Sequence, residues 1–429
     1  MAGQTVWKDD RPDVTDNNYV VKAQIARSVY YEAAMNSLFG KLNGPRELRT
    51  IESLHKGGTI TIPDGRESPV WQQNAKENNT VKFTLREPNK GMATYGDAPV
   101  KTGQFAEYKH CDCNVRTVSS PAFPVVGFES QENIKRVIND VVTVEKANIS
   151  RWASEEQDLD AFRSIFHGGS RGLLSTQDGG MGIALTGGTS GQSRSPLHTL
   201  VAGFNDLTPK AWDVTAHNSN LATRLLSLTD DESLYFNYQT HILISYLIDN
   251  LGLPPVKIGG VQYRAVAITD EWNAYRLRSD AQLVQLWQNA APRSDKNLAL
   301  YSRSALVLDD ILYIPTTQLR FFRPSVSSGI ITYGAGMDVD PRRASFSNAS
   351  QILPTVVMGA GALLRGHRRG NMWFTTEEGA HGKGAEYAVH YDDGWRRADW
   401  FAQDGRQAMS NDSSFVVFNY GKSPMAASA

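Results

Sequence analysis

The segment from Ser130 to His167 constrains the fold of this chain more than any other part of it. It contains no proline or glycine until Gly168, so nothing in it breaks a helix. Its apolar residues recur at spacings of three and four, which places them on one side of a helix and most charged residues on the other. We predict a long rod-like helix with a joint near Ser154, where a second cap can form. The apolar residues are Ile134, Val137, Ile138, Val141, Val144, Ile149, Trp152, Leu159, Phe162 and Ile165.

A helix of this kind also occurs in the core of ordinary domains, so the composition and the flanking segments have to decide. The 429 residues are 41% apolar and 21% charged, which is typical of a globular chain with two or three domains. The formal net charge of −1 argues against a protein whose main work is binding phosphates. Two cysteines are too few for a disulfide framework and favour folding in a reducing cytoplasm.

The N-terminal residues are polar and acidic, unlike a signal peptide, and no apolar run reaches the length of a membrane span. Residues 1–20 are predicted to form a polar arm, and residues 21–39 a helix that Gly40 ends. Residues 51–127 alternate apolar and polar side chains between glycine, proline and aspartate turns, which predicts a long two-stranded hairpin. Such a ribbon is marginally stable alone, so it needs a neighbouring chain.

After the rod, residues 168–195 are rich in glycine and serine and are predicted to form a surface loop. A second helix is expected over 230–250, between a Thr229 cap and Gly252, and a third after a cap at Asp270. Strands are expected in the segments 256–269, 305–316, 352–366, 371–379, 385–393 and 413–421. The mixture of helices and strands indicates an α+β fold.

The segment His110-Cys111-Asp112-Cys113 is the most metal-like cluster in the sequence. A zinc site needs four ligands, and no second cysteine pair exists. Two buried thiols in a strand are the simpler interpretation, because alternate residues of a strand face the same side. The basic clusters at 342–343, 365–369 and 396–397 are most simply solvated loops, although they are able to meet DNA phosphates or an acidic neighbour. No group of residues resembles an active site.

Several segments, in order, resemble the major capsid proteins of tailed phages of the N4-like group. The most similar segment, 253–280, carries Pro-Pro, Lys and Gly-Gly before a tyrosine-bearing strand and a helix that ends in Leu-Arg-Ser-Asp. Each motif is weak alone, and their shared order carries the resemblance. The others are Asn36-Ser-Leu-Phe-Gly40, the strand 79–85, Arg151-Trp152 with 158–166 in the rod, the strand 356–364 and the last strand, 415–420.

This resemblance implies the Hong Kong 97 phage capsid fold and a structural protein rather than an enzyme, without cofactors. The predicted parts are an N-terminal arm (1–50), an E-loop hairpin (51–127), a P-domain with the spine helix and the Gly/Ser-rich loop (128–215), an A-domain (216–394), and P-domain return strands with a tail (395–429). The Gly/Ser-rich loop and the segment 324–350 have no clear counterpart in that family.

The resemblance also implies self-assembly into hexamers and pentamers of an icosahedral shell around double-stranded DNA, built in the host cytoplasm. Portal, scaffolding and decoration proteins are further partners of such a shell, and the DNA would be met nonspecifically. Inter-subunit contacts are expected at the tip of the E-loop, through Lys90, Met92, Tyr95 and Lys101. The alternatives are a metal-dependent hydrolase that uses His110, Cys111 and Cys113, and a β-rich decoration or attachment protein.

Overall fold

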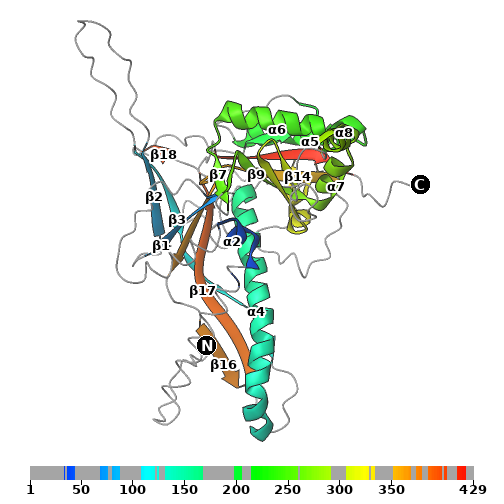
Figure 1. The fold of residues 1–429 in the computed structure, drawn as a ribbon. Coiled ribbons are helices and arrows are strands. Elements are labelled where there is room, and N and C mark those ends of the chain that lie inside the picture. Colours follow the sequence, from blue (N-terminus) through cyan, green and yellow to red (C-terminus); the bar gives the residue numbers. More distant parts are fainter. Residues whose placement is uncertain are drawn as a thin grey trace, which may run out of the picture.

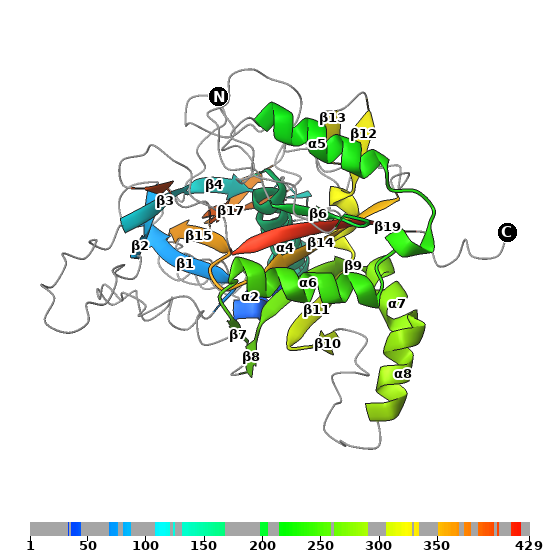
Figure 2. The same cartoon turned by 90° about the horizontal axis from the view of Figure 1, so that it is seen from above.

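The structure is a computed structural model of the chain, and Figures 1 and 2 show it from two directions. None of the helices within its described residues is long and apolar enough to cross a membrane. The described residues are 33, 36–43, 68–75, 80–86, 108–120, 123–124, 131–167, 198–204, 214–258, 261–290, 306–327, 330–333, 351–368, 373–378, 385–398, 401–402 and 413–421.

The predicted rod is a single helix, α4 (Gln131–His167), which is about 55 Å long at 1.5 Å per residue. It ends directly before Gly168, as expected. The joint predicted near Ser154 does not form, and the helix runs through it without interruption. The reason lies in packing: Ala153, Ser154 and Glu156 are buried, so tertiary contacts hold this turn in the helix.

A six-stranded sheet, which we call the rod sheet, lies along α4 (Figure 1). Its long central strand packs directly against the helix, and its pairings are antiparallel except for that of β1 with β15. The strands are β1 (Val70–Ala75), β15 (Leu363–Arg368), β17 (Ala385–Arg397) and β16 (Trp373–Glu378), with β4 (Arg116–Ser119) and β5 (Phe123–Pro124) also paired to β17.

Part of the predicted long hairpin belongs to this sheet instead. Among the described residues of 51–127, β2 (Thr80–Arg86) and β3 (Tyr108–Asn114) are the strands that pair as a hairpin, in register from Thr80↔Asn114 to Arg86↔Tyr108, and β18 (Phe401–Ala402) pairs with β3. The strands β1, β4 and β5 pair with distant partners in the rod sheet. Alternation within a strand reveals its buried face but not its partner, which is why the sequence merges these strands into one ribbon.

A second six-stranded sheet, the block sheet, forms the core of an α/β block at the upper end of the rod (Figure 1). Figure 2 shows the helices α5 (Val214–Leu226), α6 (Tyr238–Leu251), α7 (Glu271–Ser279) and α8 (Ala281–Ala290) around it. The strand order is β10 (Leu306–Leu308), β11 (Ile311–Thr316), β9 (Ala265–Asp270), β14 (Ile352–Met358), β19 (Ser414–Tyr420) and β6 (Thr199–Val201).

Alternate residues of the block sheet enter two different cores. In β9, Ala265 and Ala267 pack in the cluster that contains Ile244 and Leu247 of α6. Val266 and Ile268 belong instead to a larger cluster that also contains the C-terminal half of α4 and part of the rod sheet. This two-residue period explains why both faces of the predicted strand are apolar. The larger cluster, which we call the rod core, therefore joins the helix to both sheets.

The strand pairing groups some segments differently from the predicted domain boundaries. The resemblance places the last strand, β19, with the P-domain, and in the structure this strand pairs with β14 and β6 of the block sheet. Conversely, β15 and most of β17 fall within 216–394 and yet lie in the rod sheet. The chain crosses from one sheet to the other between Met358 and Leu363, and a contiguous division of the sequence cannot represent this crossing.

Two of the predicted helix ends are confirmed by the structure, and two are wrong. Asp270 caps α7 as predicted, its side chain accepting from the Trp272 N–H, and Gly252 ends α6 in the left-handed region. However, α6 is capped by Asn237 rather than Thr229. Gly40 lies inside α2 (Leu38–Asn43) rather than ending a helix. The remaining elements are η3 (Glu232–Leu234), β7 (Val256–Ile258), β8 (Val261–Tyr263), η6 (Gln318–Phe322), β12 (Pro324–Ser327) and β13 (Ile330–Tyr333).

We predict that Phe162→Ala in α4 destabilises the folded chain by about 3–5 kcal/mol. The Phe162 ring is fully buried and packs edge-on against Phe39 with ring centroids 5.2 Å apart, so the substitution opens a cavity in the rod core. Denaturant unfolding measures the loss. The control is Arg151→Ala on an exposed face of the same helix, which should change the stability by less than about 1 kcal/mol.

Candidate assembly surfaces

The base of the β2–β3 hairpin is fixed by its apolar inner face. Val81 and Phe83 are buried in a cluster with Leu364 of the rod sheet, whereas Lys82 and Asp112 face solvent. The residues between the two strands, 87–107, leave and return at the Arg86↔Tyr108 end of the ladder. The four predicted contact residues, Lys90, Met92, Tyr95 and Lys101, lie in this connection and outside the described residues.

The two cysteines lie on the inner face of the hairpin, as the strand interpretation predicts. Cys111 and Cys113 are both fully buried, and the Cys113 thiol donates to the Gly394 carbonyl over 3.4 Å. Burial raises the pKa of Cys113 to about 12, so the thiolate that binds metals is disfavoured. Within the described part of the chain, no three His, Cys, Asp or Glu side chains gather around a possible metal position.

A pair of glycines lets the hairpin lie close to the rod sheet. Gly366 of β15 and Gly394 of β17 are register partners. A Cβ atom at Gly366 would lie 2.7 Å from Cγ2 of Val115, and one at Gly394 would overlap the carbonyl group of Asn114. Only glycine permits this approach, so the two positions fix how the hairpin leaves the rod sheet.

Among the described residues of the predicted basic clusters, Arg365, Arg396 and Arg397 are buried and lie in strands, whereas the cluster 342–343 lies outside the described residues. Arg365 forms a two-pronged ion pair with Asp393, with Nε–Oδ1 and Nη2–Oδ2 distances of 2.9 Å. Arg397 donates from Nη1 to the Ile165 carbonyl of α4 at 3.0 Å, and Arg396 is also buried. These three arginines are buried within the rod sheet or between it and α4, so their charges are not available to DNA. The sequence misleads here because glycines and charges beside one another are typical of loops.

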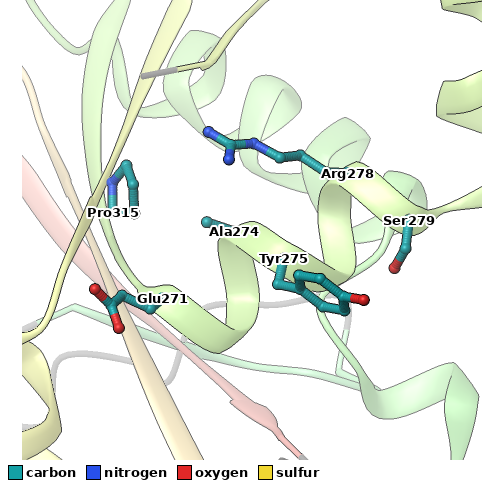
Figure 3. Close-up of a pocket in the computed structure, with 6 residues that line it drawn as sticks. All are labelled: Glu271, Ala274, Tyr275, Arg278, Ser279 and Pro315. Carbon is teal, nitrogen blue, oxygen red and sulfur yellow. The ribbon is translucent and has the colours of Figure 1, made fainter. Parts of the chain in front are cut away.

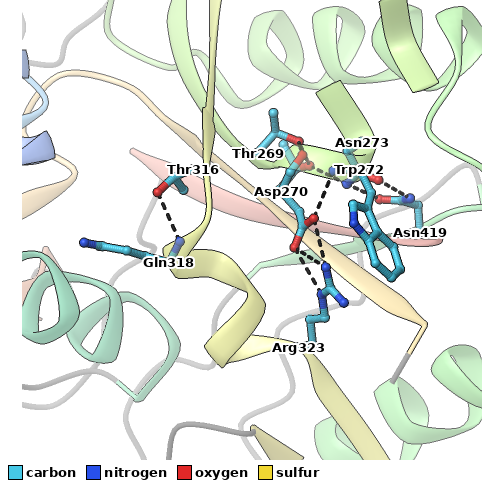
Figure 4. Close-up of polar contacts among 9 residues, drawn as sticks. Thr269, Asp270, Trp272, Asn273, Thr316, Gln318, Arg323 and Asn419 are labelled. Atoms are coloured by element: carbon cyan, nitrogen blue, oxygen red, sulfur yellow. Dashed lines mark hydrogen bonds and ion pairs between the residues drawn. The ribbon is translucent and has the colours of Figure 1, made fainter. Parts of the chain in front are cut away.

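An ion pair positions α7 in the block (Figure 4). The Arg323 guanidinium contacts both oxygens of Asp270 at 3.0–3.1 Å and lies 4.2 Å from the ring centroid of Trp272. Asp270 simultaneously accepts from the Trp272 backbone N–H, so one carboxylate caps the helix and ties it to the segment after η6.

Buried amides and hydroxyls continue this fastening across the sheet (Figure 4). Asn273 and Asn419 donate to each other's side-chain oxygens at 2.8 and 2.7 Å, which joins α7 to the last strand. Asn273 also donates to the Thr355 hydroxyl at 3.1 Å, and Thr355 contacts Thr269 at 2.9 Å. Because every amide group in the pair finds a partner, this network specifies the position of α7 without leaving polar atoms orphaned.

The outer face of α7 borders a groove of about 580 Å³ (Figure 3). Tyr275, a residue that is 57% exposed, stands at its edge, and Glu271 and Arg278 lie on either side. The lining residues are Glu271, Ala274, Tyr275, Arg278, Ser279 and Pro315. A groove that has an aromatic residue at its edge and one acidic and one basic side chain beside it is suited to contact with another protein surface.

The large hydrophobic residues that the described part of the chain exposes all lie on the α/β block. Ile242 and Tyr246 are one turn apart on α6 and are 45% and 59% exposed. Leu226 is the last residue of α5, Val261 begins β8, and Tyr275 is on α7. Exposed aromatic and branched residues are enriched where proteins meet, so the block is a candidate assembly surface that the sequence reasoning missed.

Comparison with known proteins finds solved structures with a similar fold but no matching sequence family. No family model matches, and no curated protein matches. The head structure of Helicobacter pylori bacteriophage KHP40 aligns over 82% of this chain and 89% of the phage chain, with 13% identity and a TM-score of 0.51. The capsids of Ralstonia phage GP4 and Cyanophage Pam1 align over 84% and 81% of this chain, and 89% and 88% of theirs, each with 14% identity and a TM-score of 0.50.

The chain has the Hong Kong 97 capsid fold. At 13–14% identity, the likeness establishes the fold alone. In this chain the fold consists of the long helix α4, the rod sheet, the β2–β3 hairpin and the α/β block. The fold class predicted from the sequence is therefore confirmed.

We predict that Gly394→Ala detaches the hairpin base from the rod sheet and destabilises the fold by about 1–3 kcal/mol or more, because the added methyl group overlaps backbone of Asn114. Denaturant unfolding measures the change. Lys82→Ala, on the exposed face of β2, is the control and should be close to neutral. Equal stabilities for Gly394→Ala and the parent chain would show that the hairpin does not rest on this glycine.

Proposed function

We propose that this chain is a major capsid protein of a tailed phage of the N4-like group. It would assemble into the hexamers and pentamers of an icosahedral shell that encloses double-stranded DNA. The observation that carries the proposal is the fold, which extends over more than four-fifths of the chain in alignments with phage head and capsid proteins. The ordered sequence motifs of the N4-like family are additional support.

The parts of the proposed subunit follow from this assignment. Residues 1–50 would form the N-terminal arm, and the β2–β3 hairpin with residues 87–107 the E-loop. The helix α4 would be the spine of the P-domain, and the block that carries α5 to α8 the A-domain. A ribbon that is marginal in isolation is expected where a neighbouring subunit supports it. The exposed apolar residues of the block supply a second contact surface between copies.

The proposed location is the virion capsid, assembled in the host cytoplasm. The principal partner is the chain itself, because many modest contacts repeated by symmetry stabilise a closed shell. Portal, scaffolding and decoration proteins are further proposed partners. Contact with packaged DNA would be nonspecific. The buried arginines of β15 and β17 would not take part in it, since they are engaged inside the rod sheet.

Two alternatives are less well supported. A hydrolase that uses His110, Cys111 and Cys113 needs accessible thiolates, whereas both thiols are buried in the fold and the pKa of Cys113 is raised to about 12. A β-rich decoration or attachment protein does not account for the long helix or for the capsid fold. Neither alternative rests on an observation of its own.

Expression of the full chain alone tests the proposal. Negative-stain microscopy and sedimentation velocity should show closed shells, or hexamers and pentamers that close into shells when concentrated. The same preparation should contain no stoichiometric zinc or iron. A chain that stays a compact monomer under all assembly conditions, with or without co-expressed phage proteins, would contradict the proposal. A trimer found outside the shell would favour the decoration protein.

A more specific prediction concerns the E-loop tip. Replacing residues 89–103 by an equally long Gly/Ser segment should leave subunit stability within about 1 kcal/mol, because the replacement lies beyond the last β2–β3 pair. It should strongly reduce shell yield, since it removes Lys90, Met92, Tyr95 and Lys101 together. Lys82→Ala at the hairpin base is the control. Normal shell yield from the replacement variant would remove these residues from the interface.

A further inference from the structure

The inner face of α6 is attached to the β10–β11 hairpin through one buried histidine. His241 lies in the first turn of the helix, and its side chain is completely buried. Its Nε2 atom lies 2.9 Å from Oδ2 of Asp309, and its Nδ1 atom lies 2.8 Å from the hydroxyl oxygen of Tyr313. The imidazole ring therefore bridges a carboxylate that is 60% exposed and a phenol that is 1% exposed.

The two partners determine which ring nitrogen carries the proton. A carboxylate accepts hydrogen bonds and cannot donate them, so Nε2 of His241 donates to Asp309. Nδ1 then keeps its lone pair and accepts from the Tyr313 hydroxyl. Burial, with the charge of Asp309, raises the pKa of Tyr313, so this hydroxyl keeps its proton and remains a donor. Neutral His241 thus satisfies both of its ring nitrogens and both neighbouring groups.

The carboxylate reaches the ring from a turn that most residues adopt at a steric cost. Asp309 and Asp310 form the two-residue turn between β10 and β11, and their φ angles of 46° and 60° are in the left-handed region. Asparagine followed by glycine is the preferred pair in such turns. Those residues carry no charge, whereas Asp309 supplies one directly to His241.

A second proton on the ring would disturb this bridge. Nδ1 would become a donor that faces Tyr313, whose hydroxyl has no other hydrogen-bond partner in the described part of the chain. The buried phenol would then have a proton without an acceptor, which is costly. The cation would also lie in the first turn of α6, where the helix dipole disfavours positive charge. The ion pair with Asp309 opposes these effects, but solvent screens it because the carboxylate is exposed.

The other charged groups near the ring add no compensation. Arg264 is paired with Asp249, and its positive charge disfavours a second cation. Asp280 accepts from backbone N–H groups of α6 and α8. The core cluster that α6 joins is apolar. The charged and titratable groups around His241 are Tyr238 and Asp249 on α6, Arg264 before β9, Asp280 between α7 and α8, and Asp309, Asp310 and Tyr313 on the β10–β11 hairpin.

We propose that His241 is an acid-sensitive attachment: the neutral ring holds α6 on the β10–β11 hairpin, and protonation of the ring releases the helix. Ile242, the next residue, and Tyr246 are exposed on the outer face of the same helix. Release of α6 would therefore also displace these exposed apolar side chains. The inference does not depend on the proposed function.

The direction of the pH effect follows from the two states of the ring. Burial lowers the pKa of His241 in the attached helix, Asp309 opposes this decrease, and Arg264 adds to it. Once α6 is released, the exposed ring titrates near pH 6.5. The attached state consequently binds fewer protons than the released state. Its stability is complete above about pH 6.5 and is lost as the pH falls towards the lowered pKa.

Hydrogen–deuterium exchange of the full chain, followed by mass spectrometry, measures this attachment. After correction for the intrinsic pH dependence of exchange, the protection of peptides from α6 should fall by up to about tenfold for each pH unit below about pH 6.5. His241→Gln cannot take up the proton, so its α6 protection should be independent of pH in this range. The matched control is His390→Gln, which alters a histidine that contacts Ser119 in the rod sheet and should keep the parent profile for α6.

A second variant decides the question even if His241→Gln does not fold. Asp309→Asn introduces a residue that tolerates the left-handed turn and removes the charge that favours the imidazolium. Its α6 protection should fall further on acidification than that of the parent. Protection of α6 that does not change with pH in the parent chain would overturn the proposal. The same holds for a His241→Gln chain that keeps the parent profile, or an Asp309→Asn chain that cannot be distinguished from the parent.

Discussion

The packing of the C-terminal half of α4 into the rod core is the contact on which the rest of the structure depends. Phe162 meets Phe39 and Phe322, and Phe166 stacks on Phe322 with ring centroids 5.2 Å apart. The same cluster contains residues of both six-stranded sheets, so one buried patch of the helix sets the position of each sheet relative to the other. The N-terminal half of α4 extends from this anchor alongside β17 (Figure 1).

Around this apolar core, buried ion pairs and amide hydrogen bonds fix the relative positions of helices and strands. They do not supply the bulk of the stability. Three such contacts are buried and hydrogen-bonded: the Arg365–Asp393 pair, the Asp270–Arg323 pair and the Asn273–Asn419 amides. Replacing such groups with well-packed apolar residues often costs little stability, whereas removing one partner leaves a buried charge or amide unsatisfied. Their contribution is to specify one arrangement of strands and helices.

The sequence predicted those features that local chemistry determines. The length of α4 follows from the absence of helix breakers, the start of α7 from the Asp270 cap, and the inward-facing cysteines from strand alternation. It did not predict which strands pair, because pairing depends on contacts between residues far apart in the chain. Arg365 and Arg397 were misread for the same reason: their partners, Asp393 and the Ile165 carbonyl, are distant or belong to another element. The exposure of Ile242 and Tyr246 could not be predicted, because it depends on which face of α6 packs on the block sheet.

The central claim is that this fold serves as one subunit of a closed shell in which the hairpin reaches a neighbour. An electron cryomicroscopy reconstruction of the assembled chain tests it most directly. The account predicts icosahedral particles in which α4 and both sheets match the subunit described here, and in which residues 87–107 lie against an adjacent copy. Residues 87–107 packed against their own subunit, or a chain that forms no shell, would contradict it.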